Sequence, residues 1–263
     1  MDNTYSIYQF GKELISTLDL DPVYVVIHHA QLSRKTLEKW LLAYWCFYHV
    51  GTASFISSRE DCKYWEAFRD AADSKLFPRS SERRHFRGLQ AKRSVAYLEE
   101  QGIDRLFHSF QGEMTVEEVM EIVQRWVGFG PWIAFKVADM LETLGLVKVR
   151  FNEGAMFLFD SPREGAERLW REHYETEPEE KAGTWAVERI LNQLGTTLAP
   201  PSSQRSINVQ EAETILCKWN SYRKGHYHLG EDIQAVRNGL LRFPRVPLCQ
   251  HLLKAGRQGK LWE

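Results

Sequence analysis

The feature that most constrains the fold is the recurrence of apolar side chains at helical spacing along most of the chain. Side chains three and four residues apart lie on one face of an α-helix, so this pattern predicts helices with one buried face. Apolar sets with this spacing are Leu37/Trp40/Leu41/Tyr44/Trp45/Tyr48, Val116/Val119/Met120/Val123/Trp126/Val127, Ile133/Val137/Met140/Leu141/Leu144, Val187/Ile190/Leu191/Leu194 and Ala212/Ile215/Leu216/Trp219. The sequence therefore predicts a mostly α fold of about nine helices.

Strand-like and loop-like segments are few. Runs of apolar and β-branched residues predict short strands at residues 23–27 and 147–151. Proline and polar residues predict surface connections at 172–180 and 196–206. No internal repeat or low-complexity tract divides the chain, so residues 1–263 are expected to form a single helical unit, either one domain or two lobes around a cleft.

Composition limits the class of protein further. Hydrophobic residues make up 43% of the chain, so a packed core is expected rather than disorder. The formal net charge is −1, so any attraction to a polyanion must come from local clusters of charge. The four cysteines form no C-x-x-C pair, which argues against a zinc knuckle or a disulfide framework. Because neither a signal peptide nor a membrane-spanning stretch is evident, the expected location is the cytoplasm, without a membrane partner.

A helical hairpin is expected at residues 115–144. Thr115 and Glu118 have the spacing of a capping box, which predicts the start of the first helix. The run Gly128-Phe129-Gly130-Pro131 then supplies permissive glycines and a proline suited to the first turn of the second helix. Backbone N–H groups at such a helix start can bind a phosphate oxygen. The alternative is a simple turn between two packed helices.

Asp160 is a candidate catalytic carboxylate. It follows three apolar residues and precedes Ser161-Pro162-Arg163-Glu164, which has the form of a second capping box. If Ser161 caps the helix, the Asp160 carboxylate stays available beside an apolar wall, as a general base or an electrostatic partner. The alternative is that Asp160 is itself the cap.

The clearest asymmetry of charge lies between residues 79 and 93, where six Lys/Arg and His85 face a single acid, Glu82. Arg83, Arg84 and Arg87 fall within about one helical turn, so their guanidinium groups could converge on phosphate oxygens. A solvated helix face is the alternative. Lys136 and Asp139, three residues apart near the hairpin, are expected to form a solvated ion pair.

A second candidate site segment lies at about residues 211–243. Its densest polar part, residues 219–232, contains two glycines among Lys224, His226, His228 and Asp232. Asp232 is expected at the start of a helix, and the glycines suggest a loop that a ligand approaches closely. Metal binding by His226 and His228 and an ordinary connecting loop are the alternatives.

The stretch from Gly128 to Asp139 resembles the hairpin of the helix-hairpin-helix DNA glycosylase superfamily, and the match extends over residues 115–174, about a quarter of the chain. Asp160 stands where that superfamily carries its catalytic aspartate. The resemblance implies a glycosylase-like helical fold and DNA contacts from Gly128, Phe129, Gly130, Trp132 and Lys136. Trp132 occupies the position of the Schiff-base lysine of the lyase-type enzymes, so a lyase mechanism is not implied.

The basic strip, the hairpin and the run from Ser221 to Asp232 together resemble the phage amino acid:DNA transferases, also called glutamyl/putrescinyl thymine pyrophosphorylases. This resemblance implies an enzyme that displaces pyrophosphate from 5-pyrophosphoryloxymethyluracil in double-stranded DNA with the amine of an amino acid or a polyamine. A phage-encoded protein of this kind would act in the host cytoplasm, and Mg²⁺ could accompany the pyrophosphate.

The same resemblance suggests a role for each group of candidate residues. Arg83, Arg84, Arg87 and Lys224 would bind the pyrophosphate, and Arg223 or Arg34 would bind the carboxylate of the donor. The proton acceptor would be Asp160, Asp232 or His226. Two alternatives remain at this point: a monofunctional DNA glycosylase acting through base flipping, and a non-catalytic DNA-binding protein.

Overall fold

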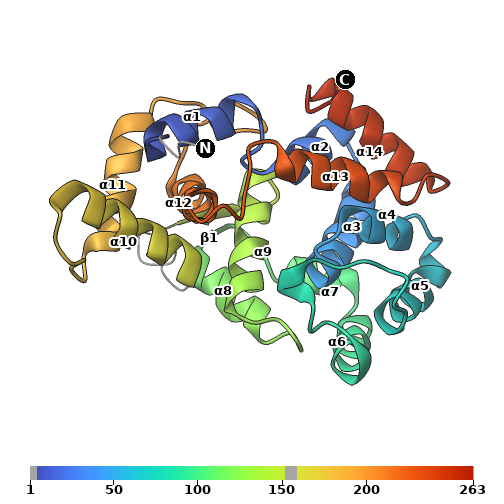
Figure 1. Ribbon diagram of the computed structural model, residues 1–263. Helices are drawn as coiled ribbons and strands as arrows, with labels where there is room; N and C mark the ends of the chain where they lie inside the picture. Colours follow the sequence, from blue (N-terminus) through green and yellow to red (C-terminus); the bar gives the residue numbers. More distant parts are fainter. Residues whose placement is uncertain (1–4, 152–158, 263) are drawn as a thin grey trace. The chain divides into compact units, whose positions relative to one another are not determined.

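A computed structural model describes residues 5–151 and 159–262 of the chain (Figure 1). The described residues contain fourteen α-helices, one 3₁₀ helix and two short strands, which confirms the mostly α class. The sequence estimate of about nine helices is too low, because several helices are short or apolar on every side and show no clear period. The chain divides into two compact units, Met1–Val25 with Arg150–Ile233 and Val26–Val149 with Gln234–Glu263.

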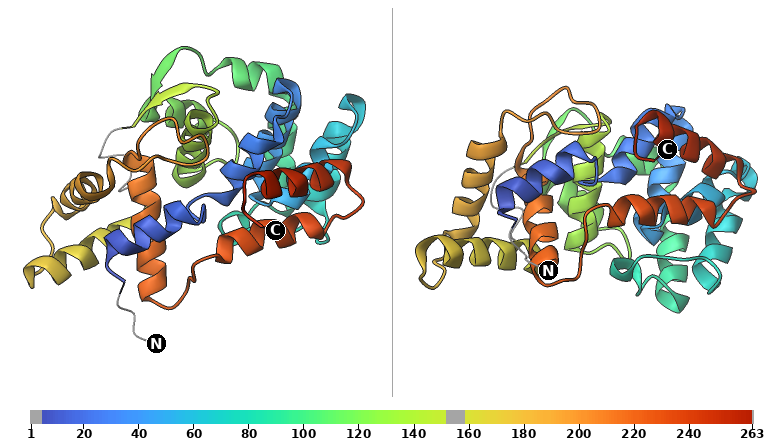
Figure 2. Two further views of the ribbon diagram at one scale, coloured as in Figure 1. Left: turned by 90° about the horizontal axis from the view of Figure 1, so that it is seen from above. Right: turned by 45° about the horizontal axis from the view of Figure 1, so that its top comes forward.

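The first unit is built around one central helix. Helix α12 (Val209–Arg223) packs against α1 (Ile7–Ser16), α10 (Asp160–Tyr174) and α11 (Ala182–Leu194), as Figures 1 and 2 show. The apolar residues of all four helices form one core, which includes Phe10, Leu194 and Trp219. Helix α10 approaches α12 closely because Gly165 has no side chain: a Cβ there would lie 2.5 Å from the Leu216 carbonyl oxygen.

The second unit holds the remaining complete helices. They are α3 (Arg34–Phe47), α4 (Val50–Ser57), α5 (Asp61–Asp73), η1 (Ser81–Arg83), α6 (Gly88–Gln101), α7 (Ile103–His108), α8 (Val116–Gln124), α9 (Pro131–Thr143) and α14 (Pro247–Gln258). Helix α3 is buried from Lys39 to Phe47, and α9 is buried from Ile133 to Leu141. Strands β1 (Glu113–Thr115) and β2 (Lys148–Arg150) pair as a two-stranded sheet.

Helices α2 (Pro22–Ala30) and α13 (Glu231–Leu241) each begin in the first unit and continue in the second. The strand expected at residues 23–27 is therefore wrong, because this segment is the middle of α2. Its four residues from Tyr24 to Ile27 are all buried, and a short helix that is apolar on every side has no helical period to detect. The strand expected near residue 149 is confirmed as β2.

The two expected connections are also confirmed, since α10 ends at Tyr174 before α11 begins at Ala182, and α11 ends at Leu194 before α12 begins at Val209. Within the part of the chain that the structure describes, no helix is both long and apolar enough to cross a membrane.

His49 gives the second unit a predictable response to acid. Its Nδ1 accepts a hydrogen bond from the Thr52 N–H, 3.1 Å away, and so caps α4. Burial, followed by the nearby charge of Arg242, lowers the pKa of His49 to about 4. An unfolded chain would bind a proton here near pH 6.5, whereas the folded chain does not until about pH 4. The contribution of His49 to the free energy of unfolding is therefore fully present above about pH 6.5 and is lost as the pH drops toward 4.

We expect His49→Asn, which keeps a cap that accepts a hydrogen bond but does not titrate, to remove up to about 3 kcal/mol of the pH-dependent loss of stability between pH 7 and pH 4. Urea unfolding followed by circular dichroism at several pH values measures it. His108→Asn, at an exposed histidine of the same unit, is the control and should leave the pH dependence nearly unchanged. Equal slopes for the wild-type protein and His49→Asn would contradict the assignment.

Candidate functional site

The hairpin forms as expected at both of its helix starts. The Glu118 N–H donates to Thr115 Oγ1 over 3.2 Å and the Thr115 N–H to Glu118 Oε2 over 2.7 Å, which confirms the capping box of α8. Helix α8 ends at Gln124, three residues earlier than the apolar period suggests, and α9 begins at Pro131. Gly130 caps α9 without a side chain, so no cap from that residue competes for the first-turn N–H groups.

The two glycines of the turn have different roles. Gly128 has φ +85°, a left-handed conformation that favours glycine, whereas Gly130 has φ −92°, which any residue can adopt. Between them Phe129 is buried, with its ring 5.2 Å from that of Trp126. The turn therefore depends on the left-handed backbone of Gly128 and on the burial of the Phe129 ring. Gly130 adds no side chain at the start of α9, so nothing from this residue covers the N–H groups there.

Arg83 joins the basic segment to this hairpin. Its side chain is 1% exposed, and it donates from Nε to the Cys46 carbonyl oxygen over 3.1 Å and from Nη1 to the Gly128 carbonyl oxygen over 3.2 Å. The guanidinium carbon lies 5.1 Å from the centre of the Phe129 ring and 5.2 Å from that of Phe86. Among the residues that the structure describes, its buried Nη2 has no hydrogen-bond partner. A guanidinium held in this way has one donor group unused.

A pocket of about 340 Å³ lies between η1 and the start of α9. The lining residues are Glu82, Arg83, His85, Gly130, Pro131, Trp132 and Ile133. Trp132 is held edge-on against Tyr48, with 5.0 Å between ring centres.

Two titratable groups of this pocket keep a fixed state near neutral pH. Burial lowers the pKa of Arg83, yet arginine remains a cation at neutral pH. Burial and then the charges of Arg83 and Arg84 lower the pKa of His85, so this imidazole is neutral near pH 7. The pocket thus combines an aromatic wall, a buried cation and a helix start, a combination suited to an anion attached to a planar group.

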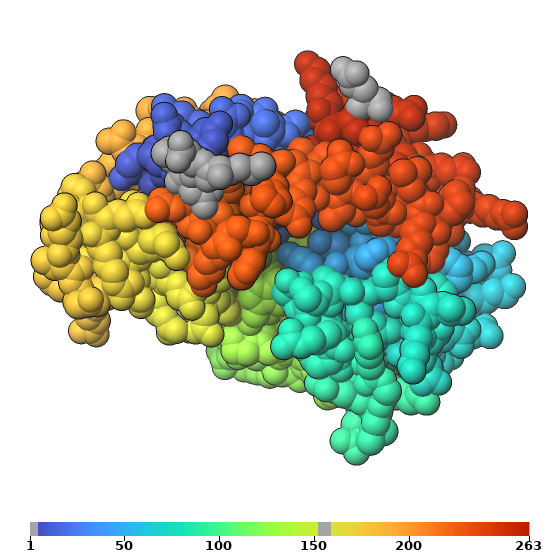
Figure 3. All heavy atoms as spheres, in the orientation of Figure 1, coloured from blue at the N-terminus to red at the C-terminus, as the bar shows by residue number. Residues whose placement is uncertain are grey.

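The three arginines expected to converge do not share one environment. Arg84 and Arg87 are exposed, and Arg84 donates to the Ser81 carbonyl oxygen over 3.2 Å. Arg79 turns inward to the carbonyl oxygens of Ala71 and Ser74. The segment 79–93 is nevertheless on the surface, seen in teal in Figure 3. Of the three arginines expected to converge, only Arg83 contacts the hairpin, through its bond to the Gly128 carbonyl oxygen. Its side chain points into the core from η1, whereas those of Arg84 and Arg87 point to solvent.

Lys136 and Asp139 form a buried ion pair, and the expectation of a solvated pair is wrong. Their side chains are 10% and 3% exposed, and Nζ lies 3.5 Å from Oδ2. Both residues belong to the stretch of α9 that is buried from Ile133 to Leu141. Lys136 is thus not presented to solvent, where it would have to lie to contact DNA.

Asp160 lies in the first unit and is exposed. Its side chain is 82% exposed and pairs with Arg163 over 2.5 Å. Helix α10 begins at Asp160 itself, two residues earlier than a Ser161 cap would place it, with Phe159 at the cap position. The Ser161 hydroxyl donates to the Cys217 carbonyl oxygen over 3.4 Å and caps nothing, so the expected capping box is absent. Phe157 and Leu158, which precede this site, lie outside the described residues.

Most charged side chains of the polar segment 219–232 form ion pairs. Lys224 pairs with Glu164, Arg223 pairs with Glu172 over 2.8 Å, and Asp232 pairs with Lys218 over 2.5 Å. His226 and His228 are exposed. Arg34 belongs to the second unit, where it pairs with Glu38 over 2.5 Å.

Asp19 is a residue that the sequence analysis missed. It is fully buried in the first unit, and its carboxylate accepts hydrogen bonds from the Tyr227 hydroxyl, from the Gly230 N–H over 2.6 Å and from the Ile233 N–H over 3.1 Å. Gly230 precedes α13 and has no side chain to cap it, so Asp19 supplies the capping oxygen from about 210 residues away along the chain. Burial and then the bond to Asp19 raise the pKa of Tyr227, which keeps its hydroxyl protonated as the donor.

Comparison with known proteins identifies the family of this chain. A family model described as amino acid:DNA transferase matches residues 15–228. The chain is 36% identical over 273 residues to the glycinyltransferase of Pseudomonas phage PaMx11, with 92% of each chain covered. It is 22% identical over 247 residues to the putrescinyltransferase of Delftia phage PhiW-14, covering 89% of this chain and 78% of that one. The chain therefore belongs to the amino acid:DNA transferase family.

Proposed function

We propose that this protein transfers glycine to a modified thymine of DNA by displacing pyrophosphate from 5-pyrophosphoryloxymethyluracil. In this reaction the glycine nitrogen forms a bond to the methylene carbon, the bond from that carbon to the pyrophosphate oxygen breaks, and the ammonium loses a proton. The observation that carries the proposal is the pocket in which the buried Arg83 guanidinium lies beside the start of α9. The likeness to a phage glycinyltransferase supports glycine as the amine.

The pocket suits the departing pyrophosphate. Negative charge grows on the leaving oxygens as the bond to carbon breaks, and donors held in place for that charge lower the barrier. Arg83 is held in place by two carbonyl oxygens and two aromatic rings, and the first-turn N–H groups of α9 add positive potential. Trp132 offers an aromatic face or edge to the base once that base leaves the stack.

A proton acceptor is needed because glycine at neutral pH carries an ammonium group, which is not a nucleophile. Of the three candidates, Asp160 and Asp232 are each paired with a cation. The His226 side chain is exposed and, among the contacts of the described residues, its imidazole makes none. Imidazole is the commonest general base in enzymes, so His226 is the acceptor we propose.

A test is to measure pyrophosphate released from a duplex that carries one 5-pyrophosphoryloxymethyluracil, with glycine, glutamate or putrescine supplied separately. Release that depends on glycine and leaves no abasic site is the expected result. Release of the free base with an abasic site would indicate a glycosylase instead. Binding of the duplex without either product would indicate a DNA-binding protein that is not a transferase.

A further inference from the structure

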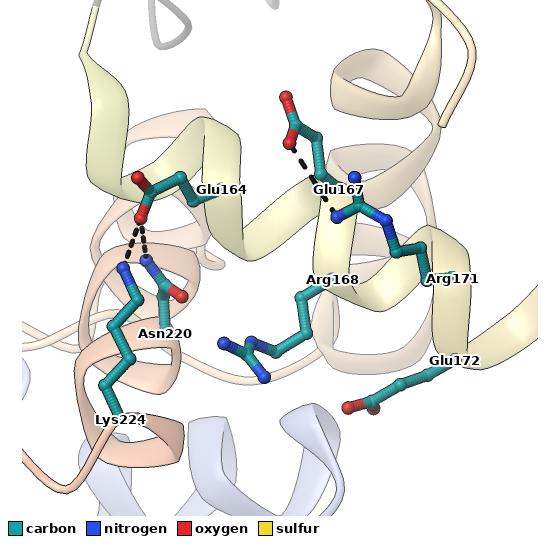
Figure 4. A pocket seen from close by; sticks show the side chains of 7 residues that line it. All are labelled: Glu164, Glu167, Arg168, Arg171, Glu172, Asn220 and Lys224. Atoms are coloured by element: carbon teal, nitrogen blue, oxygen red, sulfur yellow. Dashed lines mark hydrogen bonds and ion pairs between the residues drawn. The ribbon is translucent and has the colours of Figure 1, made fainter. Parts of the chain in front are cut away.

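Helices α10 and α12 of the first unit line a second pocket, of about 460 Å³, shown in Figure 4. Three carboxylates and three cations reach it, mostly from α10. The close packing of the two helices at Gly165 brings their polar side chains opposite one another just beyond the contact. The pocket is therefore an open pocket whose lining side chains all come from these two helices, counting Lys224 at the C-cap of α12.

Each carboxylate of this pocket already has a cation. Glu164 pairs with Lys224, and the Asn220 amide Nδ2 donates to its Oε2 over 3.0 Å. Glu167 pairs with Arg171 over 3.9 Å. Glu172 pairs with Arg223 over 2.8 Å. The bonds from Lys224 and then Asn220 hold the pKa of Glu164 below its usual value, so its carboxylate is charged at neutral pH.

Among the described residues, two groups of this pocket have hydrogen-bonding atoms without a partner, and the two are complementary, since one is a donor and the other an acceptor. Arg168 makes no hydrogen bond or ion pair, and its Nε is buried. Asn220 is 1% exposed, and its carbonyl oxygen Oδ1 is buried without a donor. In Figure 4 the Arg168 side chain reaches into the pocket from α10, and the Asn220 oxygen is on the side that faces it. One cation therefore lacks an anion, and one buried acceptor lacks a donor.

We propose that this pocket binds the zwitterion of a small α-amino acid, with its carboxylate on Arg168 and its ammonium between Asn220 Oδ1 and Glu164. Arginine binds a carboxylate through two parallel hydrogen bonds, and an amide oxygen beside a carboxylate suits an ammonium group. The inference rests on the proposed function, for which it supplies the donor site. It also selects among donors, because a polyamine has no anion for Arg168 and would leave that cation unpaired.

The position of this site differs from the donor residues suggested by the sequence. Arg223 contributes indirectly, since it neutralises Glu172 and thereby leaves Arg168 as the surplus cation. Arg34 has no part in this pocket, which lies wholly in the first unit.

The experiment is a titration of the full-length protein with glycine by isothermal calorimetry, both alone and with duplex DNA that lacks the modified base. Glycinamide and putrescine, which lack a carboxylate, are the comparison ligands. Arg168→Met should weaken glycine binding at least tenfold, and Arg168→Lys should recover part of it. Arg163→Met, at an exposed arginine of the same helix, is the matched control and should bind glycine as the wild-type protein does. Thermal melts establish that each variant is folded.

Saturable binding of glycine that is lost in Arg168→Met, with weak binding of glycinamide and putrescine, is the expected result. Unchanged affinity in folded Arg168→Met, or no glycine binding to the wild-type protein in either state, overturns the proposal. The kinetics separate this proposal from the proposed function. Transfer to DNA with an unchanged KM for glycine in Arg168→Met would reject the pocket and leave the transferase. Binding that depends on Arg168, without transfer from any donor, would reject the transferase and leave an amino-acid site.

Discussion

Replacing Arg83 by methionine is expected to lower the rate of glycine transfer to DNA by about a hundredfold or more. Methionine keeps an unbranched chain between the rings of Phe86 and Phe129 but removes the charge and every donor of the guanidinium. Loss of a donor that is fixed before the reaction costs most where negative charge grows during it. Initial rates of transfer, measured at saturating glycine, give the effect.

The hydrogen bonds of Arg83 to the carbonyl oxygens of Cys46 and Gly128 make a folding control necessary. Arg83→Lys keeps the charge and should keep part of the inhibition by inorganic pyrophosphate, which folded Arg83→Met should lose. Arg84→Met, at the exposed neighbour, should reduce activity less than threefold or so, because exposed charges contribute little. If Arg83→Met folds and is still inhibited by pyrophosphate as strongly as the wild-type protein, the pocket does not hold the leaving group.

Replacing Asp19 by alanine is expected to destabilise the first unit by about 3–5 kcal/mol. The substitution leaves three donors without their acceptor, namely the Tyr227 hydroxyl and the N–H groups of Gly230 and Ile233. Urea unfolding and hydrogen exchange of the amides at the start of α13 both report the loss. Tyr227→Phe removes one donor and leaves the carboxylate bound to both N–H groups, so it should cost only about 1 kcal/mol. Equal and small losses of stability in the two variants would show that Asp19 does not hold the start of α13 in place.

Several helices and the cap of α8 could be predicted from the sequence because their causes are local. The capping box of Thr115 and Glu118 acts over three residues, and Pro131 favours the first turn of α9 by its own geometry. The long connections before α11 and before α12 follow from proline and polar residues in the same way. Each of these features depends on neighbours in the chain rather than on the tertiary fold.

The site could be predicted only in part because burial and pairing are tertiary. Arg83 and Arg84 are adjacent in a basic run, yet only the first turns inward to the hairpin, 45 residues further along. Asp19 stands between two leucines with nothing local to identify its three donors, which lie more than 200 residues away. Asn220 could be seen only as one polar residue in a polar run. Its unpaired oxygen emerges only when α10 packs on α12.

The most direct test of the central claim is mass spectrometry of nucleosides from duplex DNA that carries 5-pyrophosphoryloxymethyluracil, after incubation with the protein and ¹⁵N-labelled glycine. A thymidine derivative that has lost pyrophosphate, retains the label and keeps its deoxyribose is the result predicted. Free modified base with abasic DNA, or unaltered nucleoside from DNA that the protein demonstrably binds, would contradict the claim.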